Sequence, residues 1–114
     1  MNLLLATVLL LFAAVAVGFY LFFLGLRQRK RSPGLGLTHA CLALSAVIVL
    51  FTEIFTGPTD KLNNVAALFL FFAVVGGGMV FALHEENRPP SMPAVTAHAI
   101  MGLVGISLLM INLF

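Results

Sequence analysis

The two halves of this chain match each other without a gap at a single offset. Subtracting 39 from 98 gives that offset, 59 residues, which places His39 on His98. Further residues that coincide include Leu11, Phe12, Ala14, Val15, Gly18, Phe22, Leu24, Ala40, Leu44, Leu50 and Phe55 with Leu70, Phe71, Ala73, Val74, Gly77, Phe81, Leu83, Ala99, Leu103, Leu109 and Phe114. Because an internal repeat determines the architecture of a chain, we interpret the match as a tandem duplication of a two-helix hairpin. Shared membrane composition is the alternative explanation.

Both matching halves are strongly apolar. Of the 114 residues, 61% are hydrophobic and 9% are charged, and the mean hydropathy is +1.13. A soluble domain of this size is mostly surface, so it has no interior large enough to hide that much apolar area. The composition therefore predicts a membrane protein, and it offers no basic, aromatic-rich surface for nucleic acid.

Four apolar segments are long enough to cross a bilayer as helices. The expected spans are residues 3–26, 35–56, 63–83 and 93–114, with Asn63 or Asn64 as the cap of the third. The predicted fold is an all-α membrane protein, a four-transmembrane-helix up-down bundle made of the repeats 1–58 and 59–114. Because each repeat has an even number of spans, both insert in the same orientation, related by a pseudo-two-fold axis along the membrane normal.

Positive charge gathers directly after the first span. The basic residues there are Arg27, Arg29, Lys30 and Arg31. Loops rich in Lys and Arg stay in the cytoplasm, so we expect loops 27–34 and 84–92 on that side and both termini outside. The small size and simple topology favour the bacterial inner membrane, with the termini in the periplasm.

His39 and His98 lie at the same depth, a few residues after Pro33 and Pro93. If the second and fourth spans face each other, both imidazoles point at a common centre. A glycine inside a helix costs about 1 kcal/mol relative to alanine, so the Gly-Gly-Gly run at 76–78 needs a reason, and room for a planar cofactor supplies one. The expected cofactor-binding residues are His39, His98, Gly18, Gly77 and Gly102.

Two opposed histidines in an apolar four-helix bundle suit haem b, because its iron takes axial imidazoles and its ring is apolar. In this arrangement the chain resembles the cytochrome b561-like group of membrane-bound b-type cytochromes. The resemblance covers the architecture and the two helices that carry a histidine followed by small residues. It implies one haem with His39 and His98 as axial iron ligands, and electron transfer with quinone or a protein partner. Many members of that group carry two haems, whereas this chain has one candidate pair of ligands.

Other functions stay open, and no catalytic residue is identified. One alternative is a non-catalytic scaffold or accessory subunit, in which the histidines bond to backbone carbonyls and small residues join membrane partners or a second copy of the chain. Another metal would need further ligands, such as His84, Glu85 and Glu86. Glu53, inside a predicted span, suggests a hydrogen bond to its repeat equivalent, Asn112, or the ion site of a small proton-coupled carrier.

Overall fold

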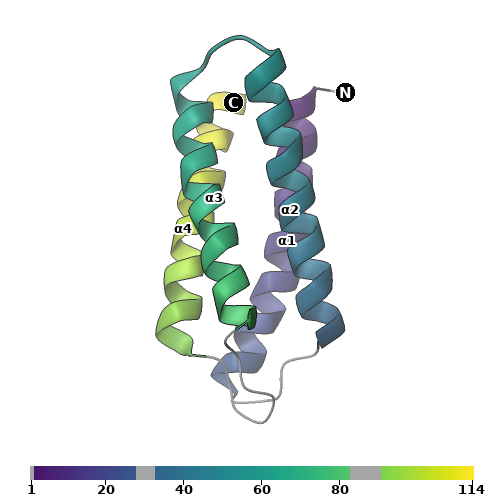
Figure 1. Ribbon diagram of the computed structural model, residues 1–114, viewed down its shortest axis with the longest axis vertical. Coiled ribbons are helices and arrows are strands. Elements are labelled where there is room, and N and C mark those ends of the chain that lie inside the picture. Colours follow the sequence, from purple (N-terminus) through teal and green to yellow (C-terminus); the bar gives the residue numbers. More distant parts are fainter. Residues whose placement is uncertain (1, 28–32, 83–90) are drawn as a thin grey trace.

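The computed structural model describes residues 2–27, 33–82 and 91–114, which form a bundle of antiparallel helices (Figure 1). The helices are α1 (Leu3–Leu26), α2 (Pro33–Thr56), α3 (Lys61–Ala82) and α4 (Met92–Leu113). Each of these four is long and apolar enough to span a membrane. The expected fold, an all-α membrane protein with an up-down four-helix bundle, is confirmed.

Helix α3 begins two residues earlier than the sequence suggested. Its cap is Asp60, whose Oδ1 accepts hydrogen bonds from the backbone N–H groups of Leu62 at 2.8 Å and Asn63 at 3.3 Å. A carboxylate in this position satisfies the N–H groups that the first turn of a helix leaves unpaired. Asn63 and Asn64, the caps that we expected, therefore lie inside the helix.

The bundle consists of two hairpins, because α1 packs chiefly on α2 and α3 chiefly on α4. Helices α2 and α4 lie diagonally opposite each other. Both termini lie at the end of the bundle where α2 turns into α3 (Figure 1). Apolar side chains from all four helices form a buried core. Its members are Leu4, Val8, Leu11, Ala46, Val47, Leu50, Ala66, Ala67, Leu70, Ile106 and Leu109.

The outer surface of the bundle is also apolar. Large side chains such as Leu9, Ile48 and Ile111 point outward with more than half of their surface exposed. Soluble monomers rarely expose large continuous apolar areas, whereas the hydrocarbon core of a bilayer covers them without cost. The surface is that of an integral membrane protein.

A polar pair ties α3 to α4 near the termini. Nδ2 of Asn112 donates to Oδ1 of Asn63 at 2.7 Å, and Asn63 is only 6% exposed. Asn112 thus pairs with Asn63 and not with Glu53, the partner that we expected, because α4 packs against α3 and lies diagonally across from α2. Glu53 lies beside the α2–α3 turn, where its backbone carbonyl accepts from the N–H of Gly57 at 2.8 Å.

Candidate functional site

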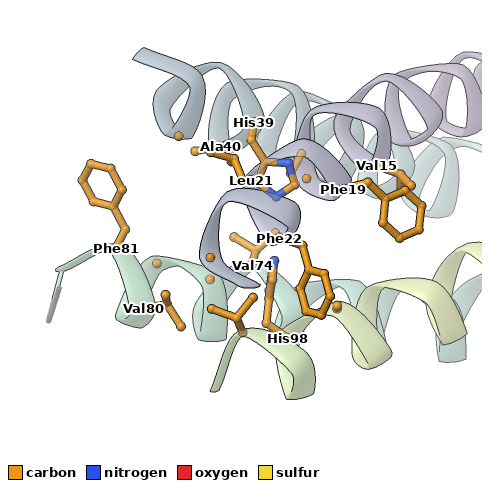
Figure 2. A pocket seen from close by; sticks show the side chains of 18 of the residues that line it. Val15, Phe19, Leu21, Phe22, His39, Ala40, Val74, Val80, Phe81 and His98 are labelled. Atoms are coloured by element: carbon orange, nitrogen blue, oxygen red, sulfur yellow. The ribbon is translucent and has the colours of Figure 1, made fainter. Parts of the chain in front are cut away.

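A pocket of about 510 Å³, seen from close by in Figure 2, lies between the two hairpins. Its lining residues belong to the half of the bundle away from the termini. All four helices contribute to its wall. Apart from His39, His98 and Thr96, the described side chains that line it are apolar, or the residue is glycine. Pockets for small molecules and cofactors have volumes of roughly 300–1,000 Å³ and mostly apolar walls, so this pocket is of the right size and character for one.

His39, on α2, is held in place by α1. Its Nδ1 lies 2.7 Å from the carbonyl oxygen of Ala14. Because a carbonyl only accepts, Nδ1 carries the proton and donates it to this bond. The ring lies against Gly18, one helical turn beyond Ala14, and a Cβ built on Gly18 would be 2.9 Å from Cε1 of His39. Glycine at position 18 therefore makes the space in which the imidazole reaches the carbonyl.

His98, on α4, is held in the same way by α3. Its Nδ1 lies 2.6 Å from the carbonyl oxygen of Ala73, and a Cβ built on Gly77 would be 2.7 Å from its Cε1. Both histidine bonds span a separation of 25 residues. The two sets of residues differ by the offset that relates the halves of the sequence, so each hairpin contains the same local arrangement.

The two imidazoles point toward one another from opposite sides of the pocket (Figure 2). Their ring centroids are 6.0 Å apart, and their planes are inclined at 84°. The structure therefore brings together the two residues that the sequence nominated as ligands, although α2 and α4 are not neighbours in the bundle.

The carbonyl bonds also decide which ring nitrogen can bind a ligand. In a neutral imidazole one nitrogen carries a proton and the other a lone pair. Since Nδ1 donates in both histidines, Nε2 carries the lone pair. Metal-bound histidines commonly donate their other N–H to a backbone carbonyl, which fixes the ring and raises its basicity. The pair is thus arranged as metal-ligating histidines usually are.

The glycines at 76–78 have different surroundings. Gly77 lies against His98, whereas a Cβ built on Gly76 or Gly78 would meet no atom within 4 Å. The same is true of Gly102, which is not among the residues that line the pocket. The sequence interpretation gave the space at Gly77 to a cofactor, but an imidazole ring occupies it.

The two carbonyl acceptors were the part of the site that sequence reasoning did not identify. Backbone acceptors carry no side-chain signal, yet a pattern for them exists. Ala14 and Ala73 coincide at the repeat offset, and each stands four residues before a glycine that also coincides, Gly18 or Gly77. An alanine and a glycine at this spacing share one helix face and leave a carbonyl accessible to a neighbouring helix.

Protein side chains alone do not complete a metal site here. Within residues 2–27, 33–82 and 91–114, no group of three or more His, Cys, Asp or Glu side chains could hold a metal ion.

Several residues named in the sequence analysis lie outside the described residues. They are the basic residues Arg29, Lys30 and Arg31, and the further metal ligands considered there, His84, Glu85 and Glu86. Arg27 is described, and its guanidinium lies over the ring of Phe23, 5.2 Å from the centroid.

Comparison of the chain with protein-family models, with curated proteins and with solved structures gave no match. Function is therefore argued from the geometry of the pocket and its two histidines.

Proposed function

We propose that this chain is a small membrane-bound b-type cytochrome that holds one haem b between α2 and α4, with His39 and His98 as the axial ligands of the iron. The observation that carries the proposal is the pair of imidazoles. They face each other with centroids 6.0 Å apart across an apolar pocket, and each is fixed by a bond from Nδ1 to a carbonyl oxygen.

The separation of the rings agrees with that of two imidazoles on one metal. An imidazole nitrogen binds a transition metal at about 2 Å, so two rings on opposite sides of one ion have their centroids roughly 6 Å apart. The measured separation is 6.0 Å. This separation leaves both rings at a distance that allows them to bind a single metal.

The rest of the site favours a macrocycle over a bare ion. A bare zinc ion takes four protein or water ligands, whereas haem iron brings four of its own and needs only axial ones. A pair of histidines in a pocket without carboxylates among its described lining meets that requirement. The apolar wall matches the faces of a porphyrin, and the volume of about 510 Å³ is in the range for a cofactor.

Haem, when bound, supplies one-electron exchange. The work of the protein is to hold His39 and His98 in position through the carbonyls of Ala14 and Ala73, and to exclude water with the apolar wall. Carbonyl bonds to the ligand rings increase their electron donation to a metal, which tunes its potential. We propose electron transfer with a quinone in the bilayer or with a protein partner at the membrane surface.

We place the chain in a bacterial inner membrane with loops 27–34 and 84–92 in the cytoplasm and both termini in the periplasm. The support is the run of basic residues from Arg27 to Arg31, since basic loops remain in the cytoplasm. In this orientation the pocket lies in the cytoplasmic half of the bilayer. The acidic edge of a haem would then find positive charge at that surface.

A scaffold or accessory subunit without a cofactor is the second candidate. One observation favours it: the bonds from His39 to Ala14 and from His98 to Ala73 already cross-link the helices of each hairpin. The histidines thus have a structural role that needs no ligand. A proton-coupled carrier has less support, because Glu53 is not among the residues that line the pocket.

An absorption spectrum of the purified protein in detergent tests the proposal. We expect a sharp Soret band and, after reduction with dithionite, the split α and β bands of a six-coordinate haem. His39→Ala and His98→Ala should each abolish this spectrum, because each removes an axial ligand. His84→Ala, which removes the histidine that is not a proposed ligand, is the matched control and should leave the spectrum intact.

A protein that stays colourless when haem is supplied during expression would refute the haem proposal and favour the scaffold. A Soret band that survives both His39→Ala and His98→Ala would refute the assignment of ligands. In the scaffold, the same two substitutions would lower the melting temperature without any change in colour.

A further inference from the structure

The pocket has two lateral sides that the repeat makes equivalent. One faces the bilayer between α1 and α4, and the other between α2 and α3. Leu103 and Leu44, which coincide at the repeat offset, both line the pocket and are both exposed, at 42% and 51%. The repeats differ at the residue directly after the glycine that lies against each histidine. This residue is Phe19 in the first half and Gly78 in the second.

Helix geometry assigns each of these residues to one side. Successive residues are about 100° apart around a helix. Gly18 faces His39 on α2, and Phe19 also lines the pocket, so Phe19 is turned from α2 toward α4. The same reasoning for Gly77 and His98 turns Gly78 from α4 toward α2. We call the two places the Phe19 side and the Gly78 side.

The Gly78 side is the more open of the two. The Phe19 side carries an aromatic ring that forms part of the pocket wall. On the Gly78 side there is no side chain at that position, and a Cβ built there would meet no atom within 4 Å. Gly78 is itself exposed and lines the pocket, so the pocket and the outer surface of the bundle meet at this residue.

We propose that the Gly78 side is the passage through which the pocket takes up its ligand directly from the bilayer, the ligand being a planar macrocycle with apolar faces that is held in the lipid. This proposal rests on the proposed function, since the ligand is the haem assigned above. Phe19 places an aromatic ring, 58% exposed, on the equivalent side, so we expect the two halves of the repeat to differ in how readily they admit the ligand.

The chemistry of the passage agrees with a lipid route. The described residues of the pocket wall include no Asp, Glu, Lys or Arg, and both helices that flank this side contribute apolar side chains to the wall, Leu44 from α2 and Phe81 from α3. The faces of a porphyrin that enters here leave hydrocarbon for an equally apolar wall, so this part of the ligand loses no polar hydration on the way.

The test is the rate of haem uptake by protein in liposomes, measured as growth of the Soret band after mixing with haem-loaded vesicles. Gly78→Phe copies the residue of the first repeat into an open position, and we expect uptake to slow by about tenfold or more with an unchanged final spectrum. The exchange variant F19G/G78F opens the other side and should restore a rate near that of the wild type. Gly78→Ala is the size control and should stay within about twofold of it.

Uptake by Gly78→Phe at the wild-type rate would overturn the proposal, because haem would then reach the pocket by another path, such as along the bundle axis. If Gly78→Phe binds no haem, the exchange variant F19G/G78F distinguishes a blocked passage from a filled pocket. Uptake by F19G/G78F supports the passage, whereas loss of binding in both variants means that the new ring fills the pocket, and this overturns it. A wild-type protein without a Soret band refutes the haem proposal itself and is recognised before any variant is made.

Discussion

Gly77→Ala is the substitution whose effect can be worked out most fully from the structure. The new Cβ would lie 2.7 Å from Cε1 and 3.1 Å from Nδ1 of His98. Ordinary contact begins near 3.4 Å, so the ring must retreat by about 0.7 Å, the difference between 3.4 and 2.7 Å. A metal–ligand bond tolerates a displacement of only about 0.2 Å, so we expect haem affinity to fall by at least about tenfold.

The stability of the bundle should respond differently from its affinity for haem. Displacing His98 weakens its bond to Ala73, a loss of about 0.6–1.5 kcal/mol for a hydrogen bond between membrane helices. The change from glycine to alanine gains about 1 kcal/mol of helix propensity. These effects nearly cancel, so the free energy of unfolding of Gly77→Ala should stay within about 1 kcal/mol of the wild type.

The neighbouring glycines supply matched controls on the same helix. Gly76→Ala and Gly78→Ala bring the same gain in propensity, and their new Cβ atoms meet nothing within 4 Å. The assay is the Soret absorbance per protein across a haem titration in detergent, with thermal unfolding measured on the same samples. Equal haem affinity in all three variants would refute the reasoning that Gly77 exists to admit the imidazole.

Three further substitutions probe the rest of the bundle. Asn112→Leu leaves the buried amide of Asn63 without its donor, and thermal unfolding should show a loss of about 1–2 kcal/mol, most of it recovered in the double variant N63L/N112L. Gly105→Val should destabilise the bundle by about 1–3 kcal/mol in the same assay, because a Cβ there already lies 2.7 Å from Cγ of Leu70. Glu53→Gln should leave the haem titration unchanged, since Glu53 does not line the pocket; a shifted affinity would tie it to the site.

The class of protein and its helices could be predicted because length and hydrophobicity alone decide them. A long run such as residues 3–26 has no stable alternative to a membrane-spanning helix, and α1 covers Leu3–Leu26. The repeat offset likewise indicated which residues are equivalent, and the contacts of His39 and His98 follow that offset. Which residues are equivalent in the two repeats follows from the sequence alone, so it could be predicted.

The sequence does not show which helices lie next to one another in the bundle. The predictions that failed depended on this information. Glu53 and Asn112 are equivalent and lie at similar depth, yet their helices are diagonal, so Asn112 bonds to Asn63. The sequence interpretation assigned the space at Gly77 to a cofactor, whereas the ring of His98 lies against this glycine, and the direction in which that ring turns depends on helix packing. Which face of a helix meets which neighbour is decided by packing of all four helices together, and one helix at a time does not reveal it.

The polar hydrogen bonds described above between helices lie within hairpins, and this determines which parts of the bundle could be redesigned. The bonds of His39 to Ala14, of His98 to Ala73 and of Asn112 to Asn63 each join two helices of the same hairpin. Each hairpin therefore has its own polar cross-link, and the distance between the halves could change without loss of any of the three bonds. A wider or narrower gap would alter the separation of the two imidazoles and the apolar packing between the halves, and larger or smaller side chains can restore that packing. The same two hairpins could thus be redesigned around ligands of other thickness by changing the residues between them, with the histidine anchors left as they are.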